Sequence, residues 1–188
     1  GVFYPDYFGK DFVLNDLTHD GGLTAIRIEG PTNSVDQRAN RLSKELGLLD
    51  QELSILDSEQ SNIFWSRTKN LEVFKSLKSN LLRIVLPMSE TLQVIQKLKN
   101  FEIKYFIDWG GSLIWASFDQ LNTKILSEIK DTVKKHQGYI TLIKVEEDLK
   151  ASADIFTIDP IKYKISEKIK RSFDPKRIFN PGKMYTGI

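Results

Sequence analysis

The chain has 188 residues, 40% hydrophobic and 28% charged, which is typical of one globular domain that buries about two thirds of its unfolded surface. It contains no cysteine, which excludes disulfides, thiolate metal ligands, iron–sulfur ligation and a cysteine nucleophile. No apolar run approaches the ~20 residues that span a bilayer.

The net charge of +2 is unevenly distributed along the chain. Residues 1–60 carry five basic and eleven acidic side chains, which gives a net charge of −6. Residues 162–183 carry eight basic and two acidic side chains. This basic stripe can face phosphates, an acidic partner surface or water, and a solvated face is the simplest interpretation.

The first third of the chain predicts few regular elements. Residues 1–20 lack periodicity and are expected to form a connecting arm. Because position 1 is glycine, we expect the C-terminal part of a longer chain whose N-terminal domain precedes the arm. Residues 23–29 alternate like a strand, and Ser34 with Gln37 predicts a capping box that opens a helix ending at Gly47. Residues 50–80 indicate a short strand or turn and a loop with a helical turn.

The middle of the chain alternates strands and helices more clearly. A strand over 81–86 is ended by a proline, and Ser89 is expected to cap a helix that turns Leu92, Ile95 and Leu98 inward. Strands over 103–109 and 112–117 flank Gly110-Gly111, which is a hairpin signal.

Three further elements complete the prediction. Asn122 is expected to cap a helix that stops at Gly138, and residues 139–145 form a strand. Asp159-Pro160 predicts an N-cap with proline at the first helical position. The resulting order predicts an α+β fold of ferredoxin-like plan, with helices packed on one face of a mainly antiparallel sheet. The predicted division is a connecting arm at 1–20, an α+β domain at 21–173 and a C-terminal tail at 174–188.

Common catalytic motifs are missing from the sequence. There is no Gly-x-Gly-x-x-Gly or Walker-type phosphate loop and no metal-binding His-Glu-x-x-His spacing. His19 and His136 lie outside any recognisable nucleophile context, and both are expected to have structural or solvent-facing roles.

The C-terminal tail carries the most informative pattern. Asp174-Pro175 ends a helix because the residue before a proline is disfavoured in the α region. Asn180-Pro181-Gly182-Lys183 predicts a turn, with proline fixing φ and glycine free to take a positive φ. Such a turn would aim Lys183 and the backbone N–H of Gly182 outward.

A second pattern surrounds the predicted hairpin. Trp109 and Trp115 flank Gly110-Gly111, and either core packing or an aromatic platform beside a cofactor or a neighbouring subunit explains them. Arg83 alternates with apolar neighbours on a predicted strand, so it is either an anion ligand or a solvent-facing residue.

These segments resemble FAD-linked oxidases of the vanillyl-alcohol-oxidase type, and most closely the FAD-binding E subunits of bacterial glycolate oxidases. The tail motif is the specific part of the resemblance, and the other segments gain weight because they occur in the same order. The resemblance runs from about residue 14 to the end and rests on the segments 21–30, 64–65, 82–87, 107–111, 138–143 and 174–185.

The resemblance implies a cap domain that covers a flavin held mainly by an N-terminal domain. It points to FAD as the cofactor and to Asn180, Gly182 and Lys183 near the flavin. From their own positions in the sequence, Arg83 and Trp109 are candidates for contact with a substrate or anion. The holoenzyme would oxidise glycolate to glyoxylate together with a catalytic D-type flavoprotein subunit and an iron–sulfur subunit. It would be cytoplasmic and peripheral at the inner face of the bacterial membrane through the complex.

The sequence leaves two alternative functions open. One is the cap of another FAD-linked 2-hydroxy-acid enzyme such as a D-lactate dehydrogenase, although the chain lacks the histidine cluster that such catalytic enzymes place at a metal. The other is a stand-alone ferredoxin-like binding module for RNA or a regulatory ligand. The aromatic strands do not match the RNA-recognition pattern.

Overall fold

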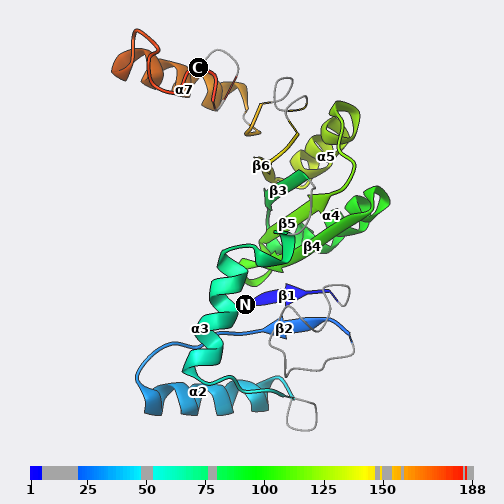
Figure 1. Ribbon diagram of the computed structural model, residues 1–188, viewed down its shortest axis with the longest axis vertical. Helices are drawn as coiled ribbons and strands as arrows, with labels where there is room; N and C mark the ends of the chain where they lie inside the picture. Colours follow the sequence, from blue (N-terminus) through cyan, green and yellow to red (C-terminus); the bar gives the residue numbers. More distant parts are fainter. Residues whose placement is uncertain are drawn as a thin grey trace. The chain divides into compact units, whose positions relative to one another are not determined.

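A computed structural model describes residues 1–5, 21–47, 53–75, 80–146, 149, 154–157, 159–183 and 185 (Figure 1). The chain forms two compact units, Gly1–Ser76 and Leu77–Ile188. None of the helices in the described ranges combines the length and apolar character that crossing a membrane requires. Residues 6–20 of the predicted arm, including His19, lie outside the described residues, and the predicted division at 20/21 and 173/174 stays a prediction.

The second unit is built on an antiparallel sheet in which the strand order is β4-β5-β3-β6. Helix α4 (Thr91–Leu98) connects β3 to β4, and helix α5 (Thr123–Lys135) connects β5 to β6. This β-α-β-β-α-β order, with the first strand beside the third, is the ferredoxin-like arrangement, so the predicted fold class is confirmed. The strands are β3 (Asn80–Val85), β4 (Ile103–Asp108), β5 (Leu113–Phe118) and β6 (Tyr139–Lys144).

The core of this unit lies between one face of the sheet and the two helices, which Figure 1 shows on the same side of the strands. Alternate residues of each strand point to this face because successive side chains of a strand alternate. The fully buried members are Leu82, Ile84, Val94, Leu98, Ile114, Ala116, Phe118 and Ile129.

The start of α4 differs from the prediction. Ser89 does not cap the helix: it lies in a short 3₁₀ turn, and Glu90 occupies the N-cap position without a side-chain bond. The apolar face is therefore shifted, so that Val94 is fully buried while Leu92 is 69% exposed. The predicted inward positions of Ile95 and Leu98 are confirmed.

The other two predicted caps are confirmed. Asn122 Oδ1 accepts from the N–H of Ile125 at 2.9 Å at the start of α5. Asp159 Oδ1 accepts from the N–H groups of Ile161 and Lys162, both at 3.0 Å, at the start of α7 (Pro160–Phe173). The bond from Lys162 is the main cause that lowers the pKa of Asp159. Each cap satisfies N–H groups that the first turn of a helix leaves without partners.

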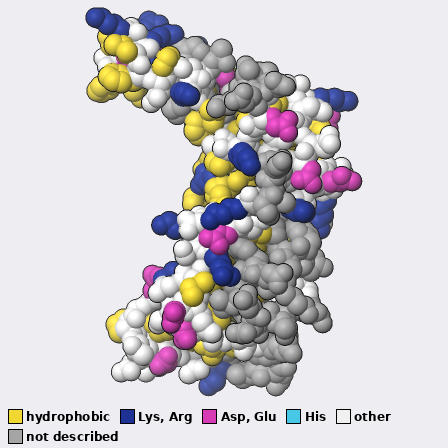
Figure 2. Space-filling view, viewed as in Figure 1, with side chains coloured by type: hydrophobic (Ala, Val, Ile, Leu, Met, Phe, Trp, Pro, Cys, Tyr) yellow, Lys and Arg dark blue, Asp and Glu magenta, His cyan; other side chains and the backbone are white. Residues whose placement is uncertain are grey.

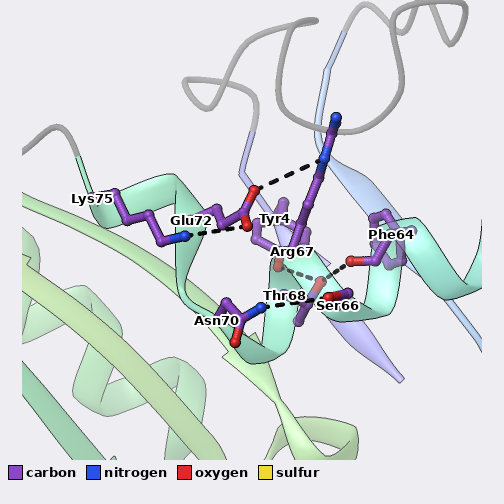
Figure 3. A network of polar contacts seen from close by, with 8 residues as sticks. All are labelled: Tyr4, Phe64, Ser66, Arg67, Thr68, Asn70, Glu72 and Lys75. Atoms are coloured by element: carbon purple, nitrogen blue, oxygen red, sulfur yellow. Dashed lines mark hydrogen bonds and ion pairs between the residues drawn. The ribbon is translucent and has the colours of Figure 1, made fainter.

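The first unit pairs β1 (Val2–Tyr4) with β2 (Leu23–Ala25) and adds helices α2 (Thr32–Glu45) and α3 (Ser58–Lys69). A buried hydrogen bond ties β1 to α3: the Tyr4 hydroxyl donates to Thr68 Oγ1 at 2.9 Å (Figure 3). The Thr68 hydroxyl in turn donates to the carbonyl of Phe64 at 3.1 Å. Because both ends are buried, this chain of bonds fixes how the strand meets the helix.

Sequence reasoning was weakest in the first unit. The predicted capping box at Ser34 is wrong, because α2 begins at Thr32 directly after Pro31 and has no side-chain cap. The helix ends as predicted, with Gly47 at φ +64°. A complete capping box occurs instead at Asp57 and Gln60, where it opens α3 over a stretch predicted as loop.

The buried face of α4 can be tested with two matched leucines. We expect Leu98→Ala to lower the free energy of unfolding by about 2–5 kcal/mol, because it removes buried methyl groups and leaves a cavity. Leu92→Ala on the exposed face of the same helix is the control, with an expected change within about 0.5 kcal/mol. Urea unfolding of both variants measures the difference, and equal losses would contradict this assignment of faces.

Candidate functional site

The C-terminal tail folds back on the end of α7 through a buried carboxylate. Asp174 follows the last helical residue, Phe173, as predicted from Asp-Pro. Its Oδ1 accepts from the N–H of Ile178 at 3.0 Å, and its Oδ2 accepts from the N–H of Phe179 at 2.9 Å. The Asp174 side chain therefore fixes the backbone as far as five residues further along the chain.

Lys170, one turn before the helix end, completes this clamp. Its Nζ lies 2.8 Å from Asp174 Oδ2 and donates to the carbonyl of Phe179 at 2.5 Å. The hydrogen bond from Lys170, supported by the N–H groups of Ile178 and Phe179, lowers the pKa of Asp174 to about 2. We call Lys170, Asp174 and the Phe179 backbone the tail clamp.

The predicted turn follows directly and is confirmed in its geometry. The N–H of Lys183 donates to the carbonyl of Asn180 at 3.3 Å, and Gly182 has φ +67°. Asn180, Gly182 and Lys183 are all exposed. No described residue bonds to the side chains of Asn180 or Lys183, so an amide and an ammonium group are available to a ligand.

The chain beyond the turn packs again through Tyr185. This buried ring lies 5.9 Å from Phe156 and 6.1 Å from Tyr163, measured between centroids. Burial, and secondarily the charge of Asp154, raises the pKa of its hydroxyl. The turn is thus held between the tail clamp on one side and an aromatic cluster on the other.

The basic stripe predicted at 162–183 runs along α7 and into this tail. Helix α7 buries none of its side chains, and Phe173 at its end is 84% exposed. At the place of α7, Figure 2 shows hydrophobic and basic side chains together on the surface. The stripe is therefore a mixed apolar and cationic surface, not a purely solvated charged face.

The other predicted residues belong to the face of the sheet away from α4 and α5. Strand pairing places Phe106, Trp115, Arg83 and Thr141 directly opposite one another across β4, β5, β3 and β6. Phe106 and Trp115 stack with centroids 6.4 Å apart. We call these four residues the cross-strand row; side chains at paired positions lie on the same face of a sheet.

Trp109 reaches this face from the hairpin turn in a strained conformation. Its φ is +53°, a left-handed backbone that costs a bulky residue on the order of 1–3 kcal/mol. Its N–H donates to Asp108 Oδ1 at 2.6 Å, and its carbonyl accepts from the Ser112 hydroxyl at 3.0 Å. The residue is 56% exposed although its backbone is held by these bonds.

The same turn is fastened to the start of α4. The Thr91 hydroxyl donates to the carbonyl of Gly111. Gly111 has φ +109°, and a Cβ there would lie 2.8 Å from Met88 Cγ. The positive φ therefore favours glycine, and any side chain there would also force the exposed Met88 side chain to shift. The predicted hairpin at Gly110-Gly111 is confirmed, and its turn positions Trp109.

Arg83 meets Trp109 across this face. The guanidinium carbon lies 4.8 Å from the centre of the Trp109 ring, within the range of a cation–π contact. The structure brings together the two predicted residues Arg83 and Trp109. It shows no contact among described residues between them and the tail turn. Sequence reasoning missed Phe106 and Thr141, although strand alternation once the register is known would identify both.

His136 belongs to a separate, buried polar group. Its Nδ1 lies 2.6 Å from Glu90 Oε2, and its Nε2 lies 3.0 Å from Lys97 Nζ. These contacts link the end of α5 to α4, in keeping with the predicted structural role. Within the described residues, no group of three or more histidine, aspartate or glutamate side chains could hold a metal ion.

The chain is similar to glycolate oxidase subunit GlcE of Escherichia coli (strain K12), with 26% identity over 178 residues. The alignment covers 93% of this chain and 42% of the relative, so the chain spans less than half the length of the curated protein it matches. No protein-family model matches the chain. The resemblance inferred from the tail and hairpin segments is confirmed by this similarity.

The tail clamp can be tested through Asp174. Asp174→Ala should speed amide exchange at Ile178 and Phe179, because their N–H groups lose a charged acceptor. Asp159→Ala, at the opposite end of the same helix, is the matched control and should leave these two amides unchanged. Hydrogen exchange followed by NMR measures both, and unchanged protection in Asp174→Ala would show that the clamp does not hold the tail.

The same clamp should respond to acid. The folded-state pKa of Asp174 is about 2, below the ordinary value of 3.8. Its contribution is therefore complete above about pH 4 and is lost as the pH falls through about 2. We expect protection factors at residues 178 and 179 to drop between pH 4 and pH 2 before the sheet unfolds. A titration that leaves them constant down to pH 2 would contradict the assignment.

Proposed function

We propose that this chain is the cap and tail part of a flavin-linked oxidoreductase subunit of the glycolate-oxidase type. The observation that carries the proposal is the tail turn, which presents Asn180, Gly182 and Lys183 on a loop fixed by the tail clamp. Similarity to a glycolate oxidase subunit over nearly the whole chain supports it independently.

The exposed groups of the turn suit the edge of a flavin ring. An amide, a backbone N–H and an ammonium group can each stabilise electron density at N1, O2 or O4 of the isoalloxazine. The side chains of Asn180 and Lys183 have no bonding partner in the described part of the chain, so their donors are available for this purpose. When bound, FAD would supply the acceptor for a hydride equivalent from the CH–OH carbon of a 2-hydroxy acid.

The proposed setting follows the sequence resemblance. The phosphate-binding part of the FAD site would belong to a region outside this chain, which itself lacks a glycine-rich phosphate loop. Glycolate would be oxidised to glyoxylate, and electrons would pass to a catalytic D-type flavoprotein subunit and an iron–sulfur subunit. The complex would be cytoplasmic and peripheral at the inner face of the membrane.

The proposal predicts the effect of two substitutions in the full-length protein. Asn180→Ala and Lys183→Ala should each weaken flavin retention or shift the flavin midpoint potential, because each loses a polar contact of about 1–3 kcal/mol to a partly buried ring. The apo protein should keep its melting temperature, since the exposed turn adds little to the core. Flavin absorbance after gel filtration and a redox titration provide the readouts.

Lys176→Ala is the matched control, because Lys176 is an exposed lysine of the same tail outside the turn. It should keep flavin content and potential. If Asn180→Ala and Lys183→Ala behave like this control, the turn is only a helix stop and the proposal loses its mechanism. Comparing turnover of glycolate and D-lactate by the full-length protein separates the two flavoenzyme candidates, and an RNA gel-shift titration tests the binding-module rival.

A further inference from the structure

Arg83 differs from the other arginines of the chain. All seven arginines lie in the described residues, and six of them contact an acidic side chain, a side-chain amide or a backbone carbonyl. Arg83 makes no hydrogen bond or ion pair with any described residue, and its guanidinium lies against the Trp109 ring. The six are Arg27, Arg38, Arg41, Arg67, Arg171 and Arg177.

This arginine is nevertheless well positioned. Its neighbours Leu82 and Ile84 are both fully buried in the core, so alternation holds Arg83 on the opposite face. Trp115 and Thr141 are its partners on the two adjacent strands, and the Trp109 ring lies over the guanidinium. The guanidinium therefore lies beside aromatic side chains, where a charge-assisted bond is stronger than in open water.

The strained turn adds a second, independent observation. Trp109 keeps a left-handed backbone that glycine would adopt more easily. Its N–H donates to Asp108, its carbonyl accepts from Ser112, and these bonds hold it there. Strain of this kind persists where the surroundings over-determine it and is concentrated at ligand sites. Here it keeps an exposed tryptophan ring beside an arginine that has no acidic partner in the described structure.

We infer that Arg83, with Trp109 beside it, anchors the carboxylate of a small organic acid on the face of the sheet away from α4 and α5. The planar guanidinium fork matches a carboxylate with two parallel hydrogen bonds. Trp109 orients the fork and shields it from water. The anion chemistry rests on this geometry alone, whereas the choice of a 2-hydroxy acid as the ligand rests on the proposed function.

The test uses the full-length protein and glycolate as the probe, with glycolamide as the uncharged analogue. Calorimetry and tryptophan quenching should show saturable binding of glycolate and at least tenfold weaker binding of glycolamide. Arg83→Gln should weaken glycolate binding by at least tenfold, and Arg83→Lys should weaken it less because the charge remains but the fork is lost. Arg41→Gln, an exposed arginine in an i,i+4 ion pair, is the control and should bind like wild type.

Two further readouts separate ligand binding from folding and from flavin. Circular dichroism of each variant checks that the fold is kept, and Trp109→Phe should reduce the quenching signal while calorimetric binding persists. Flavin content of the wild-type protein is measured on the same samples, so glycolate binding by a protein that holds no flavin would refute the proposed function but not the anchor.

Acetate, which has the carboxylate of glycolate but no hydroxyl group, tests whether the site prefers a 2-hydroxy acid. Weaker binding of acetate than of glycolate supports a 2-hydroxy acid, whereas equal binding supports a general carboxylate anchor. The inference is overturned if glycolamide binds as well as glycolate, or if folded Arg83→Gln and Arg83→Lys both bind glycolate like wild type.

Discussion

Alternation of side chains along β3 is the constraint on which the second unit depends. Leu82 and Ile84 must enter the core beneath α4 and α5, and Arg83 between them is consequently fixed on the other face. A one-residue slip in register would exchange these faces and place a guanidinium in the core, so the register is strongly specified. The same packing that stabilises the sheet therefore determines the position of the proposed carboxylate anchor.

Sequence reasoning succeeded where the chemistry of one or two residues determines the local backbone conformation. The caps at Asn122 and Asp159, the hairpin at Gly110-Gly111 and the turn ending at Lys183 follow from the preferences of single residues for particular backbone conformations. Together with strand alternation, these signals were sufficient to predict the ferredoxin-like order. The residues proposed near flavin were inferred from the family resemblance, and only their shared turn could be predicted from physical rules.

The remaining features depend on contacts that no local pattern encodes. Helix α3 carries large apolar residues at irregular spacing, and it packs through Phe64 and Thr68 against a strand more than sixty residues away in the sequence. The phase of α4 was misjudged because Ser89 resembles a cap, although a 3₁₀ turn delays the helix. The cross-strand row needs the register of four strands at once, so Thr141 could not be paired with Arg83 beforehand.

The tail clamp has a consequence for how any ligand is recognised. Fixing one residue of a flexible chain costs about 1–2 kcal/mol of conformational entropy, and a ten-residue loop that ordered only on binding would lose most of its interaction energy in this way. In this chain the bonds of Lys170 and Asp174 order the segment during folding, before any ligand arrives. A ligand that binds at the turn is therefore expected to meet a preorganised loop, so its binding should show little heat-capacity change from coupled folding.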